Sequence, residues 1–178
     1  MKVVKLTAET KKNILEHLLK RSPDSYEGFE EKVNEIVSNV KQKGDEALFA
    51  YTKQFDGVQI TKETIRVTEA EIAEAYENVD PTLLDVIRKS LVNIRSYHEK
   101  QKKYSWFDST ADGTILGQKV TPLAVVGVYV PGGKAVYPSS VLMNVVPAKV
   151  AGVDRVIMTT PPGRDGKIPA STLVAAKE

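Results

Sequence analysis

Two short and almost wholly apolar segments constrain the fold of this sequence more than any other feature. They are AVVGVYV at residues 124–130 and RVIMT at residues 155–159, and residues 139–151 between them have the spacing of a helix. Strands that are covered on both faces read as continuous apolar runs. Two such strands joined through a helix form a right-handed parallel unit. We therefore predict an α/β fold built on a parallel βαβ module.

The first hundred residues have the pattern of a helical segment instead. Apolar residues at helical spacing predict helices over about residues 7–19, 26–43, 46–55, 68–78 and a long stretch from residue 81. Thr68 with Glu71 has the pattern of a capping box, and Asp80 followed by Pro81 is typical of a helix start. A short strand is expected at residues 65–67, within this otherwise helical N-terminal segment.

We place the boundary between the two parts at residue 104, which gives a helical segment at 1–104 and an α/β module at 105–178. In the second part, residues 115–120 are a further strand candidate, and residues 171–177 begin a last helix. Two or three strands are fewer than an open parallel sheet usually has. The sheet is therefore expected to be incomplete. Apolar surface left open at its faces or edges is expected to make the chain associate with itself.

The composition excludes several classes of protein. The sequence has no cysteine, so it has no disulfide, thiolate nucleophile or cysteine zinc site. Its 25 basic and 23 acidic residues give a net charge of +2, which does not favour nucleic acid as a partner. No apolar run approaches the roughly 20 residues of a membrane-spanning helix, and the N-terminus lacks the apolar core of a signal peptide. We expect a cytoplasmic protein with no membrane or nucleic-acid partner.

The sequence VYVPGGKAVYPSS at residues 128–140 is the strongest candidate for a ligand site. It stands where a parallel strand ends and the next helix begins, which is where α/β folds bind their ligands. Gly132 and Gly133 permit a close backbone approach or a positive φ, and Ser139 or Ser140 could cap the helix. The residue types by themselves favour an ordinary Pro-Gly turn with a serine cap, because the segment is neither a G-x-G-x-x-G dinucleotide site nor a P-loop.

The longer segment from Val125 to Val153 closely resembles the signature of the histidinol dehydrogenase family. The likeness continues through residues 155–162, and residues 43–48, Tyr51 and residues 55–57 resemble the family's N-terminal helical region. Members of this family are more than twice as long as this chain, and they oxidise the amino alcohol histidinol twice with NAD to give histidine. The resemblance implies an NAD-dependent oxidoreductase of histidine biosynthesis, with an incomplete Rossmann-like module in the second part.

The resemblance also implies roles for five residues near the end of the first apolar strand. It implies that Tyr129 contacts the nicotinamide cofactor and Ser139 the substrate, and that Pro131, Gly132 and Gly133 shape the loop. The structural alternatives are an aromatic ring that only packs on its strand end and a serine that only caps its helix. We favour function over packing for the tyrosine and leave both alternatives open for the serine.

According to the resemblance, the family's zinc ligands and catalytic pair lie in later parts of its chain. Family members hold zinc with Gln, His and Asp side chains and use an adjacent Glu-His pair as acid and base. His17 and His98 lack the companions of a zinc site, so we interpret them as structural or surface residues. Asp80, Asp108 and Asp112 are interpreted as a helix cap and loop residues. We therefore expect no catalytic and no metal-binding residue in this chain, and no activity from it alone.

The resulting interpretation is the N-terminal portion of a histidinol dehydrogenase, either an engineered truncation or a natural fragment. The full enzyme is expected to act on histidinol with NAD and zinc, as a homo-oligomer and specifically a homodimer. Two alternatives stay open. One is a stand-alone module that binds a nucleotide or small anion, and the other is an NAD-dependent alcohol dehydrogenase of the same family with a different substrate. The reading frame beyond Glu178 would test the stand-alone alternative.

Overall fold

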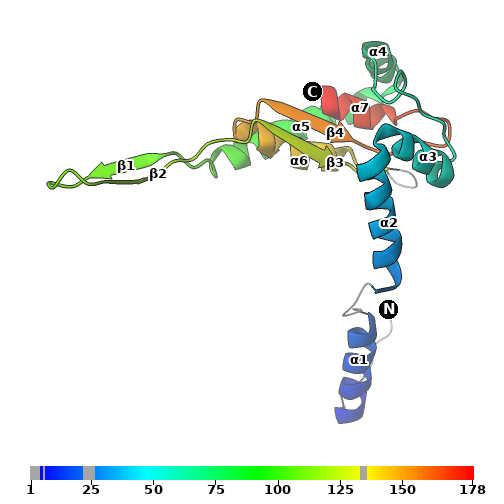
Figure 1. The fold of residues 1–178 in the computed structure, drawn as a ribbon, viewed down its shortest axis with the longest axis horizontal. Helices are drawn as coiled ribbons and strands as arrows, with labels where there is room; N and C mark the ends of the chain where they lie inside the picture. The colour runs from blue at the N-terminus through cyan, green and yellow to red at the C-terminus, as the bar shows by residue number, and fades with distance from the viewer. Residues whose placement is uncertain (1–4, 6, 22–26, 133–135) are drawn as a thin grey trace. The chain divides into compact units, whose positions relative to one another are not determined.

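The computed structural model describes residues 5, 7–21, 27–132 and 136–178 (Figure 1). Contacts divide the chain into two compact units, residues 1–48 and residues 49–178. The described elements are helices together with two small sheets, one antiparallel and one parallel. The chain is therefore mixed α/β, as the sequence predicts, with a helical N-terminal segment followed by an incomplete Rossmann-like βαβ module.

The first unit consists of helices. It contains α1 (Ala8–Arg21), α2 (Glu27–Lys43) and the start of α3 (Asp45–Asp56), in agreement with the helices predicted there. Gly44 separates α2 from α3 with a φ of 57°. The large apolar side chains Phe29, Val33 and Val37 of α2 are exposed. Their spacing reflects a helix with an apolar face, and that face stays open to solvent.

Helices α4 (Glu69–Asn78) and α5 (Pro81–Glu99) begin with the caps that the sequence predicts. The Glu71 amide donates to Thr68 Oγ1 at 3.2 Å, and the Thr68 amide donates to Glu71 Oε2 at 2.7 Å. Asp80 Oδ1 accepts from the amide of Thr82 at 2.7 Å, and Pro81 takes the first helical position. Each cap satisfies backbone donors that a helix leaves without an internal partner.

The strand predicted at residues 65–67 does not form, and residues 62–66 make turns and bends instead. Neither of the two sheets in the described part of the chain includes this segment. Val67 instead packs, partly buried, against a hydrophobic cluster formed by α4 and the C-terminal helix. Without a neighbouring strand, three residues of high β-propensity gain no ladder hydrogen bonds, and packing decides their conformation.

The predicted βαβ unit is present. Strands β3 (Val125–Tyr129) and β4 (Arg155–Thr159) pair in parallel, from Val125 opposite Arg155 to Tyr129 opposite Thr159. Helix α6 (Pro138–Val150) connects them and packs against both. Side chains alternate between half-buried and exposed along each strand. One face of this sheet is therefore covered and the other is open, although the apolar sequence of the strands predicts cover on both faces.

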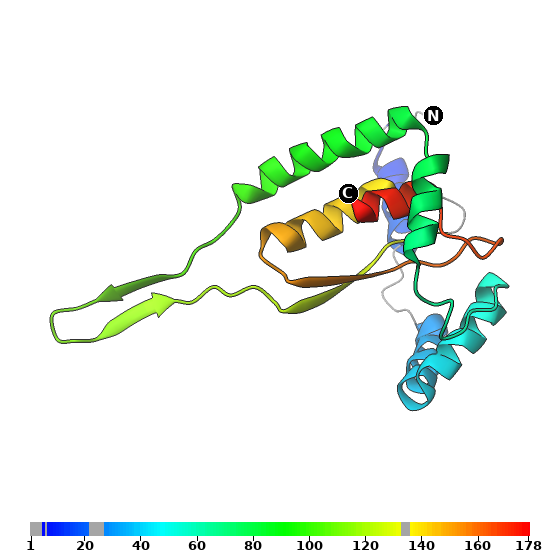
Figure 2. The same ribbon diagram turned by 90° about the horizontal axis from the view of Figure 1, so that it is seen from above.

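The core of the second unit lies between helices. Helices α5, α6 and α7 (Ala170–Lys177) run beside one another (Figure 2), and α4 packs against α7. The larger cluster of buried residues comprises Ile87, Val130, Val141, Leu142, Val146, Val150 and Ala175. Helices α4 and α5 precede residue 104 and pack on elements that follow it. The domain boundary placed at residue 104 stays a prediction. On α5, Ile87 is buried in the core, whereas Tyr97 near the C-terminal end of the helix is exposed.

Strands β1 (Trp106–Ser109) and β2 (Ile115–Gln118) form an antiparallel hairpin. The predicted strand at residues 115–120 is thus present in shorter form, but it pairs with β1, a strand that the sequence analysis missed. Thr110 and Thr114 close the turn through a backbone hydrogen bond of 2.9 Å. None of the other described helices and strands of the second unit packs against the hairpin. It is a separate ribbon and no part of the parallel sheet (Figure 2).

Candidate functional site

The candidate site is the edge where β3 and β4 end. Tyr129 and Thr159 are opposite each other in the register, and the amide of Val130 donates to the carbonyl of Thr159 at 2.9 Å. The loops that lead to α6 and α7 therefore begin side by side. In parallel α/β sheets ligands bind outside the carboxyl ends of the strands, so the fold itself selects this edge.

Tyr129 is the most prominent side chain at this edge. It belongs to the open face of the sheet and its side chain is 66% exposed, whereas the next residue, Val130, is fully buried in the core. Because side chains alternate between the two faces of the strand, Val130 anchors the backbone in the core while the ring of Tyr129 stays accessible to a ligand. This exposure leaves Tyr129 accessible to a ligand, and the preference for function over packing stays a prediction.

Gly132 has a structural reason to be glycine. A Cβ atom placed on it would lie 3.1 Å from both Cγ and the carbonyl oxygen of Pro161, and 3.2 Å from Thr160 Oγ1. The loop after β3 thus runs tightly along the loop after β4, which accounts for the glycine by a contact within the chain. The close approach to a ligand that the sequence suggests stays a prediction. Pro131 is exposed beside it, and Gly133 lies outside the described residues. The sequence analysis assigned Thr160 and Pro161 no role at this edge, although they directly follow β4.

The serine cap predicted for α6 does not form. Tyr137 occupies the N-cap position without any side-chain capping bond, and Pro138 takes the first helical position. Proline is favoured there because its missing N–H would have no partner in the helix. Ser139 therefore lies inside the first turn and is exposed. Its hydroxyl is available at the same loop as Tyr129, and the capping alternative for this serine is wrong.

Comparisons with known proteins identify the family. The model of the family described as histidinol dehydrogenase matches residues 19–178. The chain belongs to the histidinol dehydrogenase family. A histidinol dehydrogenase of Heliobacterium mobile is 57% identical over 146 residues, which are 82% of this chain and 34% of that protein. The Bacillus subtilis histidinol dehydrogenase is 53% identical over 163 residues, which are 90% of this chain and 37% of that protein.

The fold agrees with the same assignment. The crystal structure of histidinol dehydrogenase from Elizabethkingia anophelis matches with a TM-score of 0.77 and 33% identity, over 84% of this chain and 34% of that chain. The chain spans about a third of the length of the histidinol dehydrogenases that it matches. The resemblance stated from the sequence motifs is therefore confirmed at the level of the family.

Histidine and aspartate side chains have local roles where the structure describes them. The Nδ1 atom of His98 lies 2.7 Å from Gln101 Oε1, and the side chain of His17 lies outside the described residues. Asp112 accepts hydrogen bonds from Thr110 and Thr114 in the hairpin turn, which lowers its pKa. Asp108 lies within β1, and is not the loop residue that the sequence predicts. Among the described side chains, no three or more His, Asp or Glu residues form a group that could hold a metal ion.

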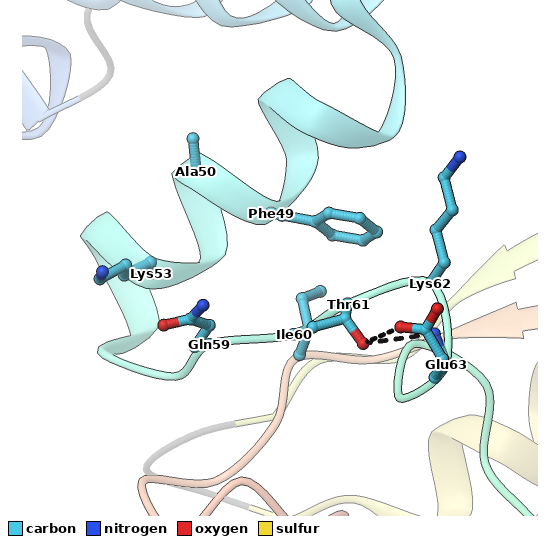
Figure 3. A pocket seen from close by; sticks show the side chains of 8 residues that line it. All are labelled: Phe49, Ala50, Lys53, Gln59, Ile60, Thr61, Lys62 and Glu63. Carbon is cyan, nitrogen blue, oxygen red and sulfur yellow. Dashed lines mark hydrogen bonds between the residues drawn. The ribbon is translucent and has the colours of Figure 1, made fainter.

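Two hollows elsewhere in the second unit are set apart from this edge. One, of about 430 Å³, lies between α3 and the following loop, where Thr61 Oγ1 donates to Glu63 Oε2 at 2.6 Å (Figure 3). That bond lowers the pKa of Glu63. The residues around it are Phe49, Ala50, Lys53 and residues 59–63. This hollow contains none of the residues that the family resemblance singles out.

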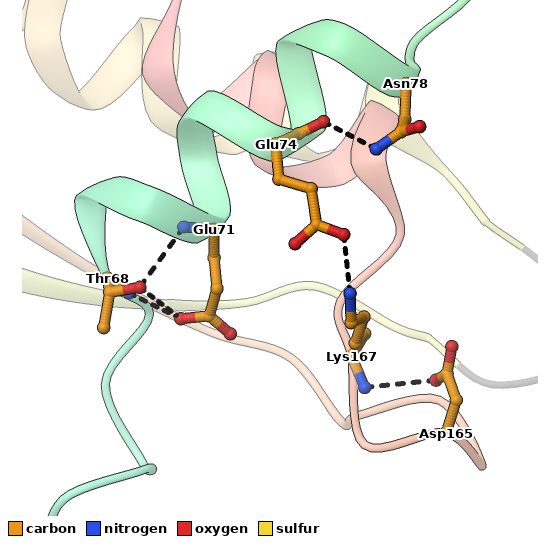
Figure 4. Close-up of polar contacts among 6 residues, drawn as sticks. All are labelled: Thr68, Glu71, Glu74, Asn78, Asp165 and Lys167. Carbon is orange, nitrogen blue, oxygen red and sulfur yellow. Dashed lines mark hydrogen bonds and ion pairs between the residues drawn. The ribbon is translucent and has the colours of Figure 1, made fainter.

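The second hollow, of about 270 Å³, lies between α4 and residues 163–170. Its acidic groups are already engaged in structural contacts (Figure 4). Glu74 pairs with Lys167 Nζ at 2.6 Å, Asp165 accepts from the Lys167 amide, and Glu71 belongs to the capping box of α4. These interactions hold the loop against α4, so the polar groups of this hollow have a structural role. The strand edge remains the candidate site.

Proposed function

We propose that this chain is the N-terminal, cofactor-side portion of a histidinol dehydrogenase. The full enzyme would oxidise L-histidinol to L-histidine with NAD and zinc, in histidine biosynthesis in the cytoplasm. The observation that carries the proposal is the family match over residues 19–178, which includes the strand edge around Tyr129. No helix in the described part of the chain is long and apolar enough to cross a bilayer.

The strand edge fits part of an NAD site. NAD, when bound, accepts the hydride that leaves the alcohol carbon. Tyr129 offers an exposed ring against which the nicotinamide can lie, and Gly132 lets the loop beside it pack closely against Pro161. The first turn of α6 contains no acidic residue, which suits an anionic ligand near its amides. Pro131 and Gly133 would fix the course of this loop.

Ser139 is the residue that we assign to the substrate. Its hydroxyl is exposed in the first turn of α6, close in sequence to the loop that would receive the cofactor. A hydroxyl can both donate and accept a hydrogen bond, so it can orient an amino alcohol without changing charge. It would act as a positioning group, and no proton transfer is assigned to it.

Zinc does not fit the described residues of this chain, because their histidine and carboxylate side chains form no group of metal ligands. No step of the reaction is therefore derived through zinc here. We expect that the remaining two thirds of the family's chain supply the metal ligands and the acid–base pair. The full enzyme would be a homo-oligomer, expected to be a homodimer, with a small molecule as substrate and without nucleic-acid or membrane partners.

The test compares two proteins for reduction of NAD with histidinol. One is this chain alone, and the other is this chain extended by the downstream two thirds of the Heliobacterium mobile relative. The chain alone should give no turnover, whereas the extended chain should be active with zinc. Steady turnover by the chain alone, or an inactive but folded extended chain, would contradict the proposal. Specific NAD binding by the chain alone, together with an inactive extended chain, would favour the stand-alone nucleotide-binding module.

Activity of the extended chain on another amino alcohol, in preference to histidinol, would favour the second alternative. That alternative is an NAD-dependent alcohol dehydrogenase of the same family with a different substrate. The residues that would discriminate between alcohols are expected mostly outside this chain.

A further inference from the structure

The β1–β2 hairpin is the element with the largest apolar surface for its size. We refer to residues 104–120, which contain both strands, as the arm. Ser105 fastens its base, because its hydroxyl accepts from the amide of Val120 at 2.9 Å and donates to the carbonyl of Val120 at 3.2 Å. Every residue of the two strands is exposed. The exposed large apolar residues of the arm are Tyr104, Trp106, Phe107, Ile115, Leu116 and Val120.

Each face of the arm has large apolar side chains beside polar residues or glycine. Trp106 and Leu116 share one face, since Asp108 is opposite Leu116 and side chains alternate along each strand. Phe107 and Ile115 share the other face. Phe107 lies directly over Gly117, where an added Cβ atom would come within 2.9 Å of the Phe107 Cα atom. Solvated hairpins bury apolar side chains on one face at most, so apolar residues on both faces indicate an element made to lie between two layers.

The described elements of the second unit supply neither layer. None of its other helices and strands packs on the arm, and an isolated two-stranded hairpin is marginally stable in water. Each aromatic side chain can bury roughly 150–250 Å². Three aromatic and three aliphatic side chains therefore offer an area comparable to the roughly 800 Å² that each partner contributes to a standard protein interface.

We propose that the arm is inserted between two layers of the downstream two thirds of the histidinol dehydrogenase chain. We choose the downstream part of the enzyme as the partner of the arm because of the length of the relatives. This chain spans about 34% of the Heliobacterium mobile protein and about 34% of the structural relative. The inference rests on the proposed function, since it takes this chain to be the N-terminal portion of that enzyme. In this arrangement the arm joins the first third of the enzyme to the rest.

Hydrogen exchange measured by mass spectrometry tests the insertion. It is recorded on the arm in this chain alone and in the chain extended by the downstream part of the Heliobacterium mobile relative. The ladder amides of β1 and β2 should exchange rapidly in the chain alone, because local opening of an unsupported hairpin costs almost nothing. In the extended chain their exchange should slow by on the order of 100-fold or more. Equally fast exchange in both proteins would overturn the proposal.

Two neighbouring residues give a matched test of the two faces. Ile115→Lys and Leu116→Lys place the same charge on opposite faces, at side chains that are 68% and 62% exposed. Each should return the arm of the extended chain to the fast exchange of the chain alone, while Val92→Lys, at an exposed position on α5, should not. Unchanged exchange in the α5–α6 core would show that the variants still fold. If one of the two arm variants had no effect, burial on both faces would be wrong.

The alternative occupant is a second copy of this chain. In that case exchange of the arm would slow in the chain alone as its concentration rises, together with a blue shift of the fluorescence of Trp106, the only tryptophan. That result would overturn the proposal. Activity is measured separately from exchange. An active extended chain whose arm exchanges rapidly would contradict only the insertion of the arm. An inactive extended chain whose arm is protected would contradict only the proposed function.

Discussion

At the scale of single residues, hydrogen bonds set the charge state of several carboxylates in this chain. The amide and hydroxyl of Thr68 lower the pKa of Glu71, and the amides of Thr82 and Leu83 lower the pKa of Asp80. Arg88 lowers the pKa of Glu178 through two hydrogen bonds of 2.8 and 3.0 Å. In each case donors stabilise the charged form, as expected for a carboxylate that accepts several hydrogen bonds.

Glu178 gives a prediction for the pH dependence of stability. Its folded pKa lies below its ordinary value, so its contribution is fully present above the pKa of the unfolded chain and is lost as the pH falls through the folded value. Glu178→Gln should therefore lower the urea midpoint at pH 7, and the difference from the wild type should shrink as the pH falls through the folded pKa of Glu178. Glu77→Gln, at an exposed glutamate of α4, is the control and should change the midpoint little throughout this pH range.

A difference between Glu178→Gln and the wild type that stayed constant as the pH was lowered until the protein unfolds would contradict this account. It would show that α7 depends on the shape of the side chain and not on its ion pair with Arg88.

Tyr129 gives the prediction for function. In the extended chain, Tyr129→Ala should raise the KM for NAD by about tenfold, which corresponds to roughly 1.4 kcal/mol of lost contact, and should change the KM for histidinol less. Tyr129→Phe keeps the ring and should behave nearly as the wild type. Initial rates at varied NAD and varied histidinol provide the measurement. Equal increases in both KM values would indicate a general loss of structure in place of a cofactor contact.

At the scale of elements, α5 shows how an amphipathic helix is held. Its inner face contributes Ile87 to the core, and Leu83, Leu91 and Ile94 pack against the same cluster. Its outer side contributes Arg88, which reaches Glu178 beside α7. The helix is thus anchored by apolar burial, and the exposed ion pair adds little to stability, because such pairs are worth about 1 kcal/mol or less.

Ile87→Ala is the test of this packing. The side chain is 3% exposed between α5 and α6, so its truncation should lower the free energy of unfolding by about 2–5 kcal/mol. The matched control is Val86→Ala at the preceding residue, which is 52% exposed and should change the free energy by about 0.5 kcal/mol or less. Urea denaturation followed by circular dichroism measures both. Similar costs for the two variants would mean that α5 does not dock through Ile87.

At the scale of the whole molecule, the chain leaves apolar surface uncovered in three places. These are the exposed residues of α2, the outer face of the β3–β4 sheet with Val125 and Ile157, and the arm. Large contiguous apolar patches are rare on monomeric proteins. This distribution of exposed apolar residues suits a chain whose family members are more than twice as long.

The chain by itself should therefore associate. We expect multi-angle light scattering at tens of micromolar to give a mass above 19.6 kDa, and a dye that binds apolar surfaces to fluoresce strongly. The extended chain, with the same surfaces covered, should bind far less of the dye per subunit. A monodisperse species of 19.6 kDa that bound no dye would show that the open surfaces are tolerated in water.

The sequence by itself determined the elements whose signals are local. Thr68, Glu71 and Asp80 mark the starts of α4 and α5 because a cap is completed within three or four residues, and apolar periodicity is a local property of a helix. The βαβ unit followed from two apolar runs, and the motif around Tyr129 was enough to indicate the family. These features need no knowledge of distant partners.

Tertiary structure alone decided the features that depend on partners far along the chain. Residues 65–67 have the composition of a strand, but neither sheet includes them, and residues 115–118 pair with β1 because the turn at Asp112 and Gly113 brings β1 beside them. Contact with Pro161 explains Gly132, and the proline at the start of α6 displaced Ser139 from the cap. A strand or a close approach gains its energy from a neighbour in space, and the residues of that neighbour are not marked in the local sequence.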